Sequence, residues 1–402
     1  MFNSRLKTHH SAMAEGAKYL KGPGVLMDVL EQKNSTNRQP ATIYIHVPFC
    51  SKICSFCNMR RSLQEPHSNY GDWIVEEIRN YGSYTSVKEM VFDAVYFGGG
   101  TPTTLDKEDL RKIIRALKEC FRFTENAEFT IETTVSELTE DKIAMFWEEG
   151  VNRFSVGVQT FHDEGRRQMN RIGSGRQAFE KLRYLKNAGF ATVSMDLIYN
   201  YPNQTVGDLM EDLKKITSLE LGGFSMYSLI NMKETKIDEA QGLKNDEEMF
   251  FRIAETMERS GYRFLELTKM VRDDTYKYIM NRHYGADTLP LGAGAGGSIC
   301  GLAMMNPIDL REYQTSVAEF GNRKGMQMHP AYKDSVIFKG DLQRGYLPRN
   351  TALYKDYEAY QAILSKLLAE HYVVKEGEEY RLTHKGIFWG NTISRELAAM
   401  TQ

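Results

Sequence analysis

The chain has 402 residues, enough for one large domain with an accessory unit. With 51 Lys and Arg against 53 Asp and Glu, its net charge of −2 argues against nucleic acid or an anionic membrane surface as a partner. No apolar run approaches the roughly 20 residues of a membrane span, and the N-terminus lacks a signal-peptide core. Five cysteines, three of them clustered, favour a reducing compartment, so we predict a cytoplasmic protein.

The first 230 residues predict an alternating α/β architecture. Residues 1–40 are polar and irregular and are interpreted as a leader or an edge cover, with His9 and His10 as candidates for gating a ligand. Strands are expected at 42–47, 94–97, 128–132, 154–159, 192–199 and 224–229, and helical spacing of apolar residues falls at 73–81, 110–121, 143–147, 179–188 and 206–216. Six alternations of this kind predict a parallel sheet curled toward a partial (β/α)6 barrel.

The alternation fades after residue 230. A helix is expected at 245–261, a glycine-rich loop at 289–301 and an amphipathic helix at 353–370. The tail after Tyr372 has the helix–hairpin–helix order of a small winged-helix-like α+β unit. We therefore expect a leader or cover at 1–40, a barrel core at 41–235, an extension with the glycine-rich loop at 236–350 and an accessory unit at 351–402.

Polar and cysteine residues gather where the predicted strands end. Cys50, Cys54 and Cys57 follow the first strand at CxxxCxxC spacing, and a run of three glycines at 98–100 follows the second. Glu132 and Asp196 lie at or near the ends of later strands, as does Gln159. Because catalytic residues of such barrels gather at the C-terminal ends of the strands, these residues are expected to share one rim.

Three cysteines on one loop admit several chemistries. Iron–sulfur clusters use thiolates at short spacings, and a cubane held by three of them leaves one iron open to another ligand. A structural zinc site is the alternative, with His46 as a fourth ligand. A redox disulfide explains the pattern less well, because it leaves the third thiol without a role.

The motif, with Phe56 just before its third cysteine, resembles the signature of radical S-adenosylmethionine (SAM) enzymes. Four further motifs extend the likeness in order along residues 42–230: the Gly98-Gly-Gly-Thr-Pro run, Phe129-Thr-Ile-Glu132, Asn152 to Gln159 and Ser194-Met-Asp196. Together they resemble the oxygen-independent coproporphyrinogen III dehydrogenase-like branch. That branch includes porphyrin-precursor decarboxylases, HemW-type heme chaperones and anaerobic heme-degrading methyltransferases.

The resemblance implies two cofactors, a [4Fe–4S] cluster and SAM. The cluster ligands would be Cys50, Cys54 and Cys57. The resemblance places SAM-binding positions at Tyr44, Phe56, Gly98, Gly99, Gly100, Thr101, Glu132, Gln159, Arg171 and Asp196. The glycines would let the backbone approach SAM, and the arginine would offer a fixed cationic fork to a carboxylate.

Two departures bear on the substrate. The decarboxylases have a further cysteine two residues after the third, where this chain has Met59. The chaperones have an Ala-His pair in the late glycine-rich loop, whereas residues 292–298 contain no histidine and resemble the ChuW/HutW heme-degrading group. The alternative for this loop is a barrel-closing turn that is rich in glycine for steric reasons.

The resemblance therefore predicts a methyltransferase that opens heme by radical chemistry and releases a linear methylated tetrapyrrole and iron. Arg60 and Arg61 are candidates for binding the propionates, or they are simply solvated. An electron donor such as flavodoxin or ferredoxin would act as a partner. No residue is assigned as a catalytic acid or base.

Overall fold

The computed structural model describes residues 2–7, 18–32, 40–231, 235–348, 354 and 356–401. His9 and His10 lie outside these ranges. The central strands are β2 (Ala41–Val47), β3 (Val91–Gly99), β4 (Arg122–Thr134), β5 (Arg153–Gln159), β6 (Thr192–Tyr199) and β7 (Gly223–Ser228). They are hydrogen-bonded as parallel neighbours in sequence order. The prediction of six parallel strands is confirmed.

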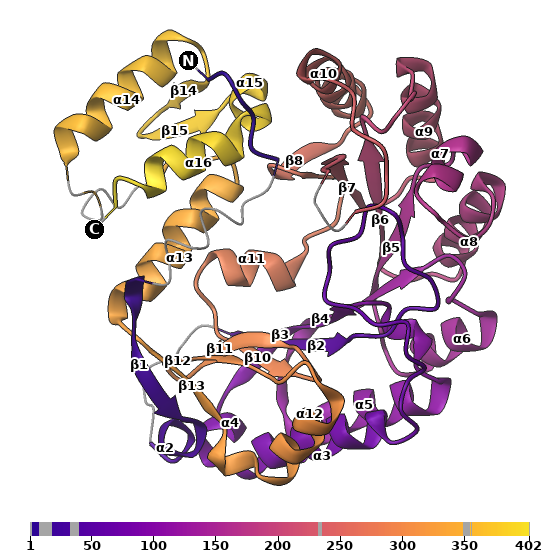
Figure 1. The fold of residues 1–402 in the computed structure, drawn as a ribbon, viewed down its shortest axis with the longest axis vertical. Coiled ribbons are helices and arrows are strands. Elements are labelled where there is room, and N and C mark those ends of the chain that lie inside the picture. Colours follow the sequence, from indigo (N-terminus) through magenta and orange to yellow (C-terminus); the bar gives the residue numbers. More distant parts are fainter. Residues whose placement is uncertain are drawn as a thin grey trace.

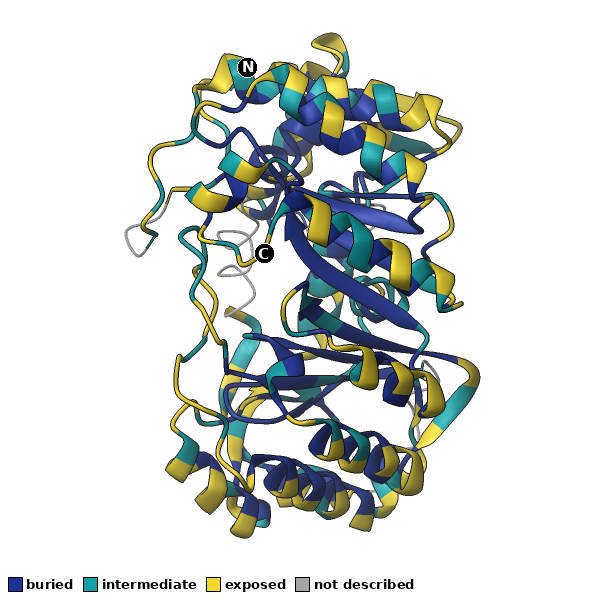
Figure 2. Cartoon of the chain, turned by 90° about the vertical axis from the view of Figure 1, so that its right-hand side faces the viewer, coloured by how far each residue is buried: buried dark blue, intermediate teal, exposed yellow. Residues whose placement is uncertain are grey.

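Helices cover the outer face of this curved sheet (Figure 1). They are α3 (Tyr70–Ser83), α4 (Thr85–Lys88), α5 (Lys107–Cys120), α6 (Glu140–Glu148), α7 (Asp163–Gln168), α8 (Gly175–Asn187), α9 (Val206–Ser218) and α10 (Leu243–Arg259), with a 3-10 turn, η2, at Pro102–Thr104. Capping boxes fix where two of them begin, Ser174 with Gln177 on α8 and Thr205 with Asp208 on α9. Figure 2 shows buried strands beneath helices whose exposed residues face outward, as amphipathic helices on a sheet require.

The sheet extends on both edges, to thirteen strands, and does not close over the described residues. Beyond β7 it continues antiparallel through β9 (Lys269–Val271) and β8 (Arg263–Glu266). Beside β2 it continues through β10 (Thr288–Leu291), β11 (Gly296–Ile299), β12 (Leu302–Met305), β13 (Lys324–Met328) and β1 (Leu20–Val25). The predicted glycine-rich loop is thus only partly a loop, because β10 pairs in parallel with β2 and β11 returns beside it.

The remaining helices fill the inside of the curve and its flanks. They are α2 (Leu26–Leu30), α11 (Lys277–His283), α12 (Leu310–Ala318), a 3-10 turn, η3, at Phe320–Asn322 and α13 (Pro330–Gln343). Figure 1 shows α11 on the concave side of β2 and β3, away from the outer helices. Glu77 on α3 joins these parts, because its buried carboxylate accepts hydrogen bonds from the Gly292 amide at 2.8 Å and the Tyr313 hydroxyl at 2.6 Å.

A small α+β unit ends the chain. It consists of α14 (Tyr357–Ala369), the hairpin β14 (Val373–Glu376) and β15 (Glu379–Leu382), α15 (His384–Phe388) and α16 (Gly390–Ala398). The predicted order of helix, hairpin and helix is confirmed. The N-terminal residues 2–7 lie against it: the Phe2 ring stacks on Trp389 at 5.6 Å, and Arg5 donates to the Phe388 carbonyl at 2.7 Å.

Candidate radical SAM active site

The three cysteines lie on the loop that leaves the C-terminal end of β2, and all three line one cavity of about 510 Å³. The cavity crosses the concave face of β3 to β7 and reaches Gln343 of α13 and Asn391 of α16. Its size is within the range of small-molecule and cofactor sites. The prediction that the strand-end residues share a rim is therefore consistent with the geometry.

Hydrogen bonds from the segment after β5 hold the cysteine loop. The Ser55 hydroxyl donates to the Gln168 carbonyl at 2.7 Å, and the Ser55 amide donates to the Met169 carbonyl at 3.2 Å. Asn170 donates through Nδ2 to the Ile53 carbonyl at 2.7 Å. A loop without regular structure thus gains fixed partners for its backbone.

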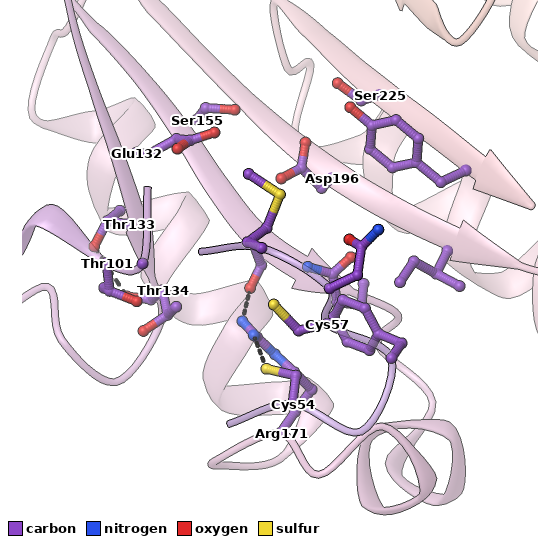
Figure 3. Close-up of a pocket in the computed structure, with 18 of the residues that line it drawn as sticks. Cys54, Cys57, Thr101, Glu132, Thr133, Thr134, Ser155, Arg171, Asp196 and Ser225 are labelled. Carbon is purple, nitrogen blue, oxygen red and sulfur yellow. Dashed lines mark hydrogen bonds between the residues drawn. The ribbon is translucent and has the colours of Figure 1, made fainter. Parts of the chain in front are cut away.

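Each thiol has its own neighbours. Arg171 Nη1 lies 3.0 Å from Cys54 Sγ, and Figure 3 shows the two side chains together at the base of the cavity. Cys50 Sγ lies 3.6 Å from Thr101 Oγ1. Burial raises the pKa of Cys50 and of Cys57, although the Met59 amide and the Arg61 guanidinium oppose the rise at Cys57. Nearby cations and hydrogen bonds favour the thiolates that bind metals.

His46 does not complete a zinc site. It is buried, with Nδ1 2.9 Å from the Tyr44 hydroxyl and Nε2 3.2 Å from the Arg60 carbonyl oxygen. Among the residues that the structure describes, no three histidines, cysteines or carboxylates, the three loop cysteines included, are grouped closely enough to hold a single metal ion. A donor set of three thiols fits an iron–sulfur cluster better than structural zinc.

The glycine run lies where the backbone of β3 meets the cysteine loop and Glu132. A Cβ on Gly100 would approach the Phe49 carbonyl oxygen to 2.5 Å, and one on Gly98 would approach Glu132 Oε2 to 2.6 Å. Gly99 has φ of +116°, a conformation that side chains other than glycine rarely adopt. Gly99, Gly100 and Thr101 line the cavity, whereas Gly98 lies behind its wall.

Glu132 is the carboxylate between the glycine run and the next strands. Its Oε1 accepts from the Tyr96 hydroxyl at 2.7 Å, and its Oε2 accepts from the Gly99 amide at 3.3 Å. Burial raises its pKa to about 7, and the negative charge of Asp196 adds to the rise. Glu132 therefore exchanges its proton near neutral pH.

Strand register places the other polar groups in a row across the sheet. Gly157 of β5 is paired with Asp196 of β6, Asp196 with Ser225 of β7, and Ser225 with Lys269 of β9. Directly paired residues point to the same face of a sheet, and all four line the cavity. Figure 3 shows Asp196 and Ser225 on neighbouring strands. Burial raises the pKa of Asp196, and the positive charge of Lys269 opposes that rise.

Gln159 and Arg171 reach this row from the end of β5. Gln159 has φ of +74° next to a bulge in the pairing of β5 with β6, so its side chain is directed differently from the regular alternation. The Arg171 guanidinium also donates to the Gly157 carbonyl. Both line the cavity, as does the half-buried Phe56.

Tyr44 differs from its expected position. It does not line the cavity, because its hydroxyl is hydrogen-bonded to His46 and its ring stacks on Tyr278 at 6.1 Å.

The two arginines that were candidates for binding propionates occupy different places. Arg61 lines the cavity and donates to the Cys57 carbonyl at 2.6 Å, whereas exposed Arg60 lies outside it, 2.8 Å from Met305 Sδ.

A buried charge network beneath the cavity has no counterpart in the sequence predictions. Arg153 binds Asp274 through two hydrogen bonds, of 3.0 and 2.8 Å, and Lys269 Nζ lies 3.4 Å from the same carboxylate. Burial alone would raise the pKa of Asp274, but these two cations hold it well below its usual range. The Tyr276 ring covers both cations. Lys269 and Asp274 lie in the predicted extension, where charged residues are too common to single out, and Arg153 lies in the Asn152 to Gln159 motif without an assigned role.

Comparison with known proteins agrees with this geometry. Residues 44–216 match the model of the Radical SAM superfamily. The chain therefore contains a radical SAM domain, and proteins of that superfamily use a [4Fe–4S] cluster and SAM. The prediction of both cofactors is confirmed at the level of the family.

Within the superfamily, the chain resembles proteins of tetrapyrrole metabolism. It is 28% identical over 376 residues to the anaerobilin synthase of Escherichia coli O157:H7, covering 90% of this chain and 84% of that protein. The heme chaperone HemW of Lactococcus lactis is 25% identical, covering 89% and 97%. The oxygen-independent coproporphyrinogen III oxidase of Salmonella typhimurium is 29% identical, covering 71% and 67%. The predicted branch is thus confirmed.

The fold agrees with the solved structure of coproporphyrinogen III oxidase (HemN) from Escherichia coli, with a TM-score of 0.77, 24% identity and 92% of each chain covered. Within the described ranges, every helix is too short or too polar to span a bilayer.

Proposed function

We propose that this chain is a radical SAM methyltransferase that opens heme without oxygen, yielding a linear methylated tetrapyrrole and free iron. The observation that carries the proposal is Met59, which lines the cavity, is 52% exposed and stands at the position where the decarboxylases have a further cysteine. The likeness to anaerobilin synthase along 90% of the chain supports the same choice.

In this proposal Cys50, Cys54 and Cys57 hold the cluster. The cluster and SAM, when bound, supply one electron, a carbon-centred radical and a methyl group. Glu132 and Asp196 line the same cavity as the three cysteines and would balance the positive charge of SAM. The backbone of Gly99 and Gly100 would leave room for its amino-carboxylate, and Thr101, Phe56 and Gln159 would complete the walls.

Both arginines that line the cavity have a buried donor that the protein leaves unpaired. Nε of Arg171 and Nε of Arg61 are both buried without a hydrogen-bond partner, and both residues line the cavity. Buried donors in proteins are normally satisfied, so each favours an acceptor on a ligand. Arg171, beside Cys54, would receive the SAM carboxylate, and Arg61 would receive a propionate.

The cavity suits a radical reaction on a flat, largely apolar substrate. Ile198, Leu229, Ile230 and Ile279 line it together with Tyr227. These side chains would exclude water from a reactive radical more than they would move protons. No histidine lines the cavity among the residues described, so the proposal assigns no histidine ligand to the heme iron.

The test is a reaction of the reconstituted protein with heme, SAM and a reductant under anaerobic conditions. Loss of the Soret band together with a methylated linear tetrapyrrole supports the proposal. Heme that stays bound and intact after many equivalents of SAM and electrons supports a chaperone instead. Release of carbon dioxide from coproporphyrinogen supports the decarboxylase.

A further inference from the structure

The segment from α7 to α8, residues 163–187, is strongly basic in a chain whose net charge is −2. It contains seven lysines and arginines and three aspartates and glutamates. Arg176 and Arg183 are exposed on α8, where Arg183 pairs with Glu180, and the 74% exposed Arg167 on α7 pairs with Glu164. This concentration of positive charge on one side of the molecule attracts an acidic partner over several ångströms of solvent.

The same segment holds the cysteine loop. Its residues 168 to 171 make the hydrogen bonds to Ile53 and Ser55 described above, and Arg171 contacts Cys54 Sγ. Exposed Ile172 follows Arg171 directly, with 43% of its surface accessible. Only Arg171 and its hydrogen bond therefore separate exposed Ile172 from the Cys54 thiol.

A groove of about 650 Å³ runs along this face. Its lining includes Arg176, Arg183 and Tyr184 of α8, the last of which is 44% exposed. It shares Val135, Ser136 and Ile172 with the wall of the cluster cavity. The groove thus offers a few apolar side chains edged by three cations and two carboxylates, Glu140 and Glu180, and it adjoins the cluster cavity, which is the mixed composition of a transient protein interface.

We propose that this surface, made by Ile172, Arg176, Arg183 and Tyr184, docks a small acidic one-electron carrier protein of the flavodoxin or ferredoxin class. The bound carrier passes one electron inward past Arg171 to the cluster; the carrier is oxidised by one electron, the cluster is reduced by one, and no atom is transferred. The inference rests on the radical SAM assignment and not on which tetrapyrrole is the substrate.

The experiment compares two reductants on the cluster-loaded protein. Reduction of the cluster is followed by its absorbance in stopped flow, with reduced flavodoxin or with dithionite, in the absence of tetrapyrrole. The variant is Arg176→Glu with Arg183→Glu. Arg176 is in the first turn of α8, where a carboxylate favours the helix dipole, so its reversal does not weaken the fold.

We expect the variant to lower the flavodoxin-driven rate about tenfold at low salt, with the difference shrinking as salt screens the charges. Dithionite-driven reduction should be unchanged. Binding of oxidised flavodoxin, measured by calorimetry, should weaken in parallel. The matched control is Lys375→Glu, the same charge change on the exposed β14 hairpin, which lies across the molecule from α8 (Figure 1).

Equal flavodoxin-driven rates for the variant and the wild type would overturn the proposal. So would an equal loss with both reductants, because that result places the defect at the cluster. Should the double variant not accumulate, Arg176→Glu alone against Arg176→Lys gives the same comparison. Because no tetrapyrrole is present, the outcome is independent of whether heme is the substrate.

Discussion

Glu132 gives the site a measurable dependence on pH. Its carboxylate is enclosed by Tyr96 and Gly99 on one side and faces Asp196 across the sheet, and burial raises its pKa from an ordinary 4.5 to about 7. A carboxylate whose pKa is higher in the folded state binds its proton more tightly there. The protein without cofactors therefore loses stability as the pH rises between these two values.

The size of this loss follows from the two pKa values. Between pH 5 and pH 8.5, linkage predicts that Glu132 lowers the free energy of unfolding by about 2–3 kcal/mol. Glu132→Gln removes the titration and nearly preserves the shape. The variant should therefore gain about 2–3 kcal/mol relative to the wild type over this interval, while binding SAM less well because it lacks the negative charge.

The assay is urea denaturation of the cofactor-free wild type and of Glu132→Gln at both pH values. Since every other titrating group is present in both proteins, the change in their difference reports Glu132 together with its coupling to Asp196. A difference that stays constant from pH 5 to pH 8.5 would show that the carboxylate is not buried as described. Denaturant slopes that differ between the two proteins would indicate another change in the unfolding reaction.

Three further predictions concern the cluster loop and its support. Cys54→Ala should lose most of the bound iron and sulfide after reconstitution, whereas Cys120→Ala, on α5 away from the cavity, should keep both; equal contents would refute the ligand assignment. Asp274→Asn should lower the free energy of unfolding by about 3 kcal/mol, measured with urea, because it leaves two buried cations poorly compensated. Gly100→Ala should cost about 1–3 kcal/mol in the same measurement by pressing on the cysteine loop. Gly242→Ala, with open space around its Cβ, should have little effect, and similar costs for both would contradict the packing argument.

The parallel core was predictable because each of its strands is a short apolar run followed by a helix with its own spacing and caps. The cysteines and Glu132 could be assigned to one rim because parallel strands end at the same edge. These inferences need only local pattern and one rule of topology. The spacing of the cysteines alone did not distinguish an iron–sulfur cluster from a zinc site. The resemblance of the motifs to a known family favoured the cluster.

Non-local contacts could not be predicted. Strand β10 pairs with β2 from more than 240 residues away, and a glycine-rich sequence contains no signal for its partner. Lys269 reaches the cavity because β9 is antiparallel to β7, a register that periodicity does not fix. The resemblance places Tyr44 among the SAM-binding positions, yet packing on Tyr278 takes it away from the cavity. Sequence position thus identified the site more reliably than it oriented individual side chains.

Transfer of a labelled methyl group tests the central claim most directly. The reconstituted protein is supplied anaerobically with heme, a reductant and SAM that carries a deuterated methyl group, and the tetrapyrroles are analysed by mass spectrometry. The account predicts a ring-opened tetrapyrrole that has gained the deuterated methyl, together with released iron. Recovery of unlabelled, intact heme after repeated cleavage of SAM would contradict it.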